Sequence, residues 1–142
     1  MDTIIEAIKN MSTFTQILWL IIIVWGIWEI TQYFRRKNSA TPLSNDEFKE
    51  NLRKVQLIDV RNRDEYNAGH ILGARNIPFT ELKQRYQELR KDMPIYLYED
   101  GTYLAYRTAI TLKKHGYEDI YILADGYKNW EGRIKRNKRV EE

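Results

Sequence analysis

The chain has 142 residues, which is enough for one modest domain and an appendage but not for a two-domain enzyme. Its net charge of +3 comes from 23 basic and 20 acidic residues that are mixed along the chain, so we expect no nucleic-acid partner. The sequence contains no cysteine, which excludes disulfides, thiolate metal sites and thiol nucleophiles.

A dense apolar segment near the N-terminus predicts a transmembrane helix. Residues 13–34 provide about the 20 residues that a helix needs to cross a hydrocarbon core. Aromatic residues such as Trp28 and Tyr33 lie toward its C-terminal end, and the basic residues 35–37 follow directly. A cleaved signal peptide would carry its positive charges before the apolar stretch, and a buried core helix is the other alternative. The pattern favours a retained anchor.

The basic residues 35–37 also predict the orientation of this anchor. Positive charges next to a membrane span stay on the cytoplasmic side, so we expect a single-pass protein of the cell membrane with a cytoplasmic domain. In the N-terminal flank, residues 1–12, isoleucines at helical spacing either extend the helix or lie along the membrane surface. Residues 35–43 are expected to form a basic stop and a short polar linker.

The remainder of the chain predicts strands that alternate with helices. Ser44 with Glu47 and Asn62 with Glu65 form capping boxes at the starts of two helices, and Thr80 is the expected cap of a third. The expected strands are residues 55–60, 74–77, 95–98 and 120–123, and the expected helices are residues 44–54, 62–69, 81–89, 103–115 and from 127 onward. This alternation predicts an α/β fold, a parallel sheet flanked by helices on both faces, over residues 44–134.

The last residues, 135–142, form a charged tail. For this tail a solvated helix end is favoured over contact with the membrane surface. We expect neither a metal site nor a cofactor, because the two histidines have no acidic residues at metal-ligand spacing. The sequence does not indicate an oligomeric state.

The segment LIDVRNRDEYNAGHILGARNIP, residues 57–78, resembles the signature of the rhodanese family. In that signature a strand ending in D-V-R is followed by E-Y, G-H-I, G-A and N-I-P. The matching residues are Asp59, Arg61, Glu65, Gly69, His70 and Gly73. The resemblance places Asp59 and Arg61 at the end of a buried strand and Gly69 at the end of a short helix. It also gives His70 a structural hydrogen bond and Gly73 a close backbone approach.

A second block, ADGYKNW at residues 124–130, is similar to the family's G-G-x-x-x-W, with Asp125 in place of the first glycine. The resemblance therefore covers about residues 44–132 and implies a rhodanese-like fold.

The resemblance also implies where a catalytic cysteine would stand. In the family an apolar strand is followed by C-x-x-G-x-R-S and a helix, and the loop amides hold the sulfur as an anion. Here the strand is followed by EDGTYLA, which places Glu99 at the cysteine position and Leu104 at the arginine position, while Gly101 lies one place before the family's glycine. We expect the loop amides to hold the Glu99 carboxylate ionised, and a cysteine placed there to have a lowered pKa.

These replacements predict an inactive rhodanese-like protein without a catalytic residue. A carboxylate neither accepts a sulfane sulfur nor forms a phosphocysteine, and a leucine cannot hold thiosulfate or phosphate. The leading hypothesis is a binding or scaffold module for a protein or small ligand. Its expected site is the former active-site loop, called here the Glu99 loop: Glu99, Asp100, Gly101, Thr102, Tyr103 and Leu104.

Two alternatives to this hypothesis remain. The chain could assist a sulfurtransferase pathway by docking a thiol-bearing partner without carrying sulfur itself. Glu99 could also act as a general base in a new reaction, although the adjacent Asp100 is poorly placed to assist it because consecutive residues rarely converge.

Overall fold

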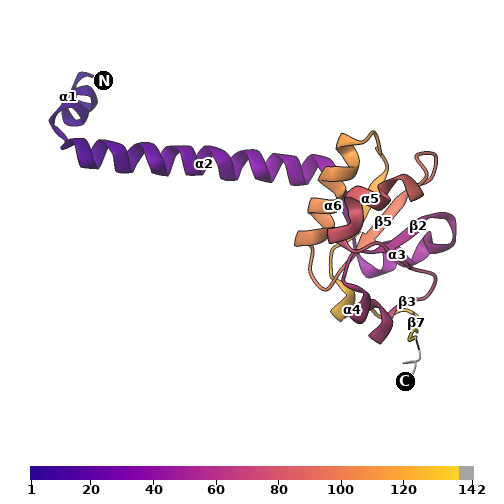
Figure 1. Cartoon of the computed structure of the whole chain (residues 1–142). Coiled ribbons are helices and arrows are strands. Elements are labelled where there is room, and N and C mark those ends of the chain that lie inside the picture. Colours follow the sequence, from indigo (N-terminus) through magenta and orange to yellow (C-terminus); the bar gives the residue numbers. More distant parts are fainter. Residues whose placement is uncertain (138–142) are drawn as a thin grey trace. The chain divides into compact units, whose positions relative to one another are not determined.

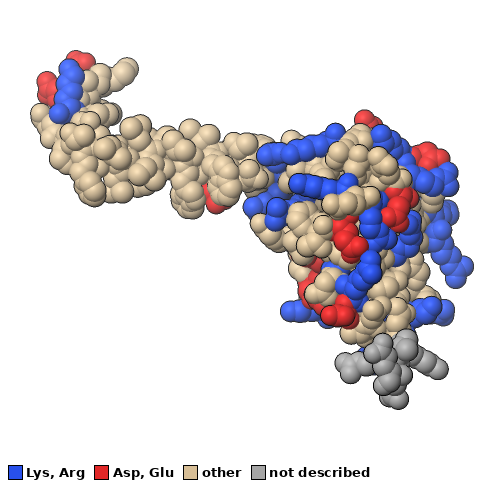
Figure 2. Space-filling model, viewed as in Figure 1, with Lys and Arg blue, Asp and Glu red and all other residues tan. Residues whose placement is uncertain are grey.

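The chain divides into two compact units in the computed structural model, Met1–Arg35 and the residues from Arg36 onward. The structure describes residues 1–137. Charged side chains are sparse along the long N-terminal helix and dense over the second unit (Figure 2). Each unit is described separately below.

The first unit contains a short helix, α1 (Asp2–Asn10), and most of a long helix, α2 (Thr13–Ser39) (Figure 1). Met11 has an extended backbone and ends α1. The Ser12 hydroxyl accepts a hydrogen bond from the Thr15 amide (3.3 Å) at the start of α2. The N-terminal flank therefore forms a helix of its own and does not extend the long one.

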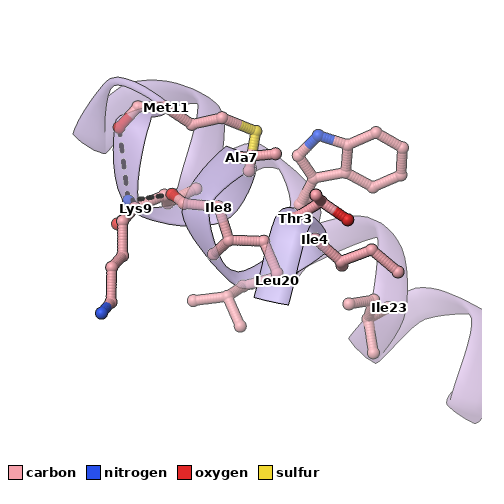
Figure 3. A pocket seen from close by; sticks show the side chains of 10 residues that line it. Thr3, Ile4, Ala7, Ile8, Lys9, Met11, Leu20 and Ile23 are labelled. Atoms are coloured by element: carbon pink, nitrogen blue, oxygen red, sulfur yellow. Dashed lines mark hydrogen bonds between the residues drawn. The ribbon is translucent and has the colours of Figure 1, made fainter. Parts of the chain in front are cut away.

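A groove of about 820 Å³ lies between α1 and α2 (Figure 3). Ile4 and Ile8 of α1 and Leu20 and Ile23 of α2 contribute to its mostly apolar lining. The Gln16 side chain donates a hydrogen bond to the Ile8 carbonyl (3.0 Å) and so ties the two helices together. Lipid chains would fill such a groove in a bilayer, and we assign no other ligand to it.

The helix α2 is long and apolar enough to cross a membrane. Its 27 residues give a length of roughly 40 Å at 1.5 Å per residue. Large apolar side chains such as Trp19, Ile23 and Trp25 are more than half exposed. A helix with apolar side chains on all sides is typical of a membrane span. The anchor at residues 13–34 rests on length and composition and stays a prediction.

The second unit is built around a five-stranded parallel sheet with the order β1-β6-β5-β2-β4. Its strands are β1 (Thr41–Leu43), β2 (Gln56–Asp59), β4 (Arg75–Asn76), β5 (Ile95–Tyr98) and β6 (Ile120–Leu123). The four strands predicted from the sequence are all present, and every neighbouring pair is parallel. The predicted parallel sheet is confirmed.

Strand β1 lies in the segment that the sequence assigned to a polar linker. Residues Thr41 to Leu43 pair with Tyr121 to Leu123 of β6. Three residues that include a proline show no strand periodicity, and β1 forms because β6 offers an unpaired edge. Pro42 is tolerated there because an edge strand leaves some of its N–H positions unpaired. The linker prediction for these residues is wrong.

Helices cover both faces of the sheet. On one face lie η2 (Phe79–Glu81), α5 (Leu82–Arg85), η3 (Tyr86–Glu88) and α6 (Tyr103–Lys114), and on the other lie α3 (Asn45–Glu50), η1 (Leu52–Lys54), α4 (Arg63–Ala68) and η4 (Tyr127–Asn129). The central strand β5 alternates between the two cores, with Ile95 and Leu97 in the first and Tyr96 and Tyr98 in the second. The prediction that helices flank the sheet on both faces is confirmed.

Both predicted capping boxes start helices. The Ser44 hydroxyl accepts a hydrogen bond from the Glu47 amide (3.4 Å), and the side-chain Oδ1 of Asn62 accepts one from the Glu65 amide (2.9 Å). The first of these helices is shorter than predicted, because α3 ends at Glu50 and a separate 3₁₀ turn, η1, continues to Lys54.

The predicted helix 103–115 is present as α6, whereas two other predicted helices are shorter than expected. The segment from Glu81 to Leu89 is broken into α5 and two 3₁₀ turns, and Thr80 does not cap it because η2 already begins at Phe79, directly after Pro78. The helix expected from Tyr127 onward is one 3₁₀ turn.

A short strand follows η4 where the helix was expected to continue. This strand, β7 (Ile134–Lys135), pairs antiparallel with β3 (His70–Ile71). The turn between η4 and β7 folds the Trp130 ring against the Gly132 backbone, where a side chain would collide with the ring. The predicted charged tail, residues 135–142, begins in β7, and its residues 138–142 lie outside the described part of the chain.

Candidate functional site

The Glu99 loop connects β5 to α6 at the carboxyl end of the parallel sheet. Glu99 directly follows the last residue of β5, and α6 begins at Tyr103. The Glu99 residue is only 7% exposed, and its Oε1 accepts a hydrogen bond from the Leu104 amide (3.0 Å). Its carboxylate therefore occupies the strand-to-helix turn and is bound by an amide of the first turn of α6.

Gly126 holds the Glu99 loop from the second sequence block. Its φ of +76° favours glycine, and a Cβ atom there would overlap the Asp100 carbonyl. The next amide, of Tyr127, donates a hydrogen bond to the Glu99 carbonyl (2.7 Å). Asp125 points elsewhere and accepts a hydrogen bond from the Asn45 amide (3.3 Å). The first position of this block therefore has room for the Asp125 side chain, whereas the second position favours glycine.

A pocket of about 450 Å³, called here the Glu99 pocket, opens beside the loop. Its charged lining residues are Arg61, Glu65, Glu99 and Asp100, and its apolar lining residues are Val60, Pro78, Phe79 and Leu104. Asn62, Thr80 and Gly101 complete the lining. Thr102 and Tyr103 do not line the pocket, and Tyr103 is 60% exposed on the surface of the loop.

Asp59 and Arg61 form a buried ion pair next to the pocket. Arg61 Nη2 lies 2.6 Å from Asp59 Oδ2, and the same nitrogen donates to the Gly69 carbonyl (2.6 Å). The guanidinium also lies 4.2 Å from the centre of the Tyr127 ring. Only Nη1 approaches the loop, 3.7 Å from Asp100 Oδ1. The Arg61 guanidinium is thus occupied by contacts within the fold. It is poorly placed to bind an anion in the way that the family's loop arginine does.

Three carboxylates face the Glu99 pocket, from Glu65 on α4 and from Glu99 and Asp100 on the loop. Burial raises the pKa of Glu99 more than the amides of Leu104 and Tyr103 lower it, and the charges of Asp100 and Glu65 raise it further. Burial also raises the pKa of Glu65, with Asp100 adding to the shift. The amides of the loop therefore do not dominate the pKa of Glu99, contrary to the expectation from the sequence, because burial outweighs them.

The remaining signature residues serve the fold. His70 is buried, and its Nδ1 donates a hydrogen bond to the Tyr66 carbonyl (2.8 Å), as expected. A Cβ atom at Gly69 would lie 2.7 Å from the Tyr127 hydroxyl, so the close approach occurs at this glycine. Gly73 has open space around it and a φ of +89°. The predicted close approach at Gly73 is wrong, and its left-handed backbone is the reason for glycine.

Sequence reasoning missed the apolar wall of the pocket. Pro78 and Phe79 reach it because the 3₁₀ turn η2 starts directly after the N-I-P triplet. The Phe79 amide donates a hydrogen bond to the Val60 carbonyl (3.1 Å), which fixes this turn beside the end of β2. The available signal was the position of Phe79 immediately after the family triplet.

Comparison with known proteins assigns this fold and site to a family. The family model for the rhodanese-like domain matches residues 44–133. The chain belongs to the rhodanese-like domain family. The rhodanese-like domain of the Alr3790 protein from Anabaena has a solved structure that is 26% identical, with a TM-score of 0.62, over 71% of this chain and 83% of that one.

Two relatives from Bacillus subtilis extend this comparison. The uncharacterized protein YqhL is 44% identical over 122 residues, which cover 86% of this rhodanese-like protein and 97% of YqhL. A match of that length extends beyond the rhodanese-like domain into the segment of α2. The putative sulfur carrier protein YrkF is 28% identical over 119 residues, covering 75% of this chain and 64% of YrkF. The chain thus corresponds to only part of YrkF.

Proposed function

We propose that this rhodanese-like protein is a membrane-tethered, non-catalytic binding module that uses the Glu99 pocket and the adjoining loop surface. One observation carries the proposal: the buried Glu99 carboxylate occupies the amide site in which a rhodanese would hold a sulfur anion. A carboxylate cannot become a persulfide, and the chain has no thiol that could replace it.

The retained frame around the pocket supports a binding role. The contact of Gly126 with the loop and the Asp59–Arg61 pair hold the pocket open in the absence of the cysteine. Within residues 1–137 no lysine or arginine forms an ion pair with Glu99. Burying an unpaired carboxylate is unfavourable, and such groups concentrate at functional sites. Selection for stability alone would favour an apolar residue at this position.

The membrane tether rests on α2 and the basic residues 35–37 that follow its apolar part. By the positive-inside rule, a cytoplasmic rhodanese-like domain is part of the proposal. The similarity to YqhL includes part of this helix, which suggests that helix and domain work together. A tether at the membrane would confine the partner of the Glu99 loop to the same surface.

Comparative capture from detergent-solubilised membranes tests the binding role. The bait is the full chain, with Tyr103→Ala as the loop variant and Lys128→Ala, an exposed position outside the pocket, as the matched control. We expect a partner that is retained by the wild type and the control but lost from Tyr103→Ala. Equal capture by all three baits would contradict binding through the loop.

The alternative is an accessory role in sulfur transfer, which the similarity to YrkF, a putative sulfur carrier protein, favours. In that case the chain would dock a thiol-bearing partner without carrying sulfur. Adding the full chain to a purified sulfur donor and acceptor would then accelerate transfer between them, and the Tyr103→Ala variant would not.

A further inference from the structure

The charges that line the Glu99 pocket are opposite to those that an anion would require. Three carboxylates and one guanidinium line it, and that guanidinium, of Arg61, is already paired with Asp59 at 2.6 Å. The position that the family pattern reserves for an arginine holds Leu104. Thiosulfate or phosphate would meet net negative charge here, whereas a cation would be attracted.

The burial of one of these carboxylates, that of Glu99, strengthens the case for a cationic ligand. Glu99 is 93% buried and lines the pocket, and within residues 1–137 its side chain receives hydrogen bonds only from backbone amides of its own loop. A carboxylate offers about four acceptor positions, so most of its capacity is unused. In the described part of the chain it has no cation as a partner, although its neighbours Glu65 and Asp100 add like charge. A ligand cation would occupy the unused acceptor positions of Glu99 and would also provide the missing positive charge.

The apolar wall of the pocket fits the stem of a long basic side chain. Val60, Pro78, Phe79 and Leu104 line the same pocket as the carboxylates. The rim already accommodates one arginine of this chain, because the Arg107 guanidinium lies 4.6 Å from the centre of the Phe79 ring and does not line the pocket itself. Lysine and arginine bury their methylene stems on such surfaces while the charged head binds oxygen.

We propose that the Glu99 pocket receives an arginine or lysine side chain of a partner polypeptide, with the methylene stem against Phe79 and Leu104 and the cationic head among Glu65, Glu99 and Asp100. The inference rests on the proposed function and specifies the chemistry of the partner. The raised pKa values of Glu65 and Glu99 agree with it, because burial is the largest cause of both shifts and the charge of Asp100 adds to both.

The test uses the full chain, labelled with ¹⁵N, in zwitterionic detergent micelles. It is titrated with the amides of N-acetyl-arginine and N-acetyl-lysine, and with that of N-acetyl-citrulline, the neutral isostere of arginine. We expect the backbone amides of residues 99–104 to shift saturably with a cationic probe. Citrulline should bind about tenfold more weakly, which corresponds to about 1.4 kcal/mol. Which of the two cations binds more tightly identifies the head group.

Variants connect these shifts to the pocket. Glu99→Gln should weaken cation binding by a factor of about five or more, and Glu118→Gln, an exposed position outside the pocket, should leave it unchanged. Glu65→Gln, on the partly exposed face of α4, provides the same test if Glu99→Gln fails to fold. Equal binding of citrulline and arginine, or unaltered affinity in the folded Glu99→Gln and Glu65→Gln variants, would overturn the inference.

Thiosulfate separates this inference from the proposed function. Saturable shifts of the same amides by thiosulfate, together with thiocyanate formation, would refute the proposed function itself. Loss of partner capture in Tyr103→Ala without any preference for cations would retain the proposed function and refute the inference alone.

Discussion

Restoring the missing cysteine measures what the Glu99 loop still offers to an anion. In Glu99→Cys the thiol would meet the same surroundings as the glutamate: burial, the charges of Glu65 and Asp100, and the amides of Tyr103 and Leu104. Burial and like charges raise the pKa of a thiol, just as they raise that of a carboxyl group, and the amides lower it. Because the first two prevail for Glu99, we expect them to prevail for the thiol.

The thiol pKa should therefore lie above the ordinary value of about 8.5, which reverses the expectation from the sequence alone. At pH 7.5 this shift would reduce the thiolate fraction, and with it the rate of alkylation by iodoacetamide, below those of a free cysteine. The triple variant Glu99→Cys, Glu65→Gln, Asp100→Asn removes the like charges and should lower the thiol pKa again in part, because the contribution of burial remains. Thiosulfate turnover should stay weak in both until Leu104→Arg supplies a cation.

A titration of alkylation rate against pH decides this prediction. A thiol pKa below 8 in the single variant would refute the reasoning, since the amides would then outweigh burial and charge. An unchanged pKa in the triple variant would show that Glu65 and Asp100 do not act on position 99.

Three further predictions concern acid stability, the loop contact and membrane topology. A raised pKa means that the folded state binds the Glu99 proton more tightly than the unfolded chain does, so this residue's contribution to stability falls as pH rises from its ordinary pKa of 4.5 through the folded value. Glu99→Gln should therefore increase the free energy of unfolding at pH 7 by on the order of 1 kcal/mol and lose this advantage below about pH 4, as urea unfolding would show. Gly126→Ala should lower the free energy of unfolding by at least about 2 kcal/mol, because of its positive φ and the overlap with Asp100. Gly73→Ala should lower it only by the φ strain of about 1 kcal/mol. Equal losses in the two variants would contradict the contact between Gly126 and the loop. A reporter fused after the C-terminus should be cytoplasmic, and neutral residues at 35–37 should weaken that orientation; protease cleavage of the domain from outside intact cells would contradict it.

Local signals in the sequence were enough to predict most elements of the rhodanese-like domain. The side chains of Ser44 and Asn62 bond amides three residues away, and the four apolar residues of β5 need only a buried environment. Such features depend on neighbours in sequence, and for that reason the sequence alone predicts them.

Elements that depend on distant partners could not be predicted. Strand β1 exists because β6, about 80 residues later, offers an edge, and β7 exists because β3 pairs with it. The sign of the Glu99 pKa shift has the same origin, because it depends on burial and on Glu65, which belongs to another element. The loop position of Glu99 could be counted along the chain, but its electrostatic surroundings required the fold.

The central claim is that this rhodanese-like protein carries no sulfur. The most direct test is to incubate the full chain in detergent micelles with thiosulfate and cyanide and to measure thiocyanate, with a cysteine-containing rhodanese as the positive control. We expect no thiocyanate above the protein-free background at any protein concentration. Turnover that scales with the concentration of this protein, and that persists across independent purifications, would contradict the claim.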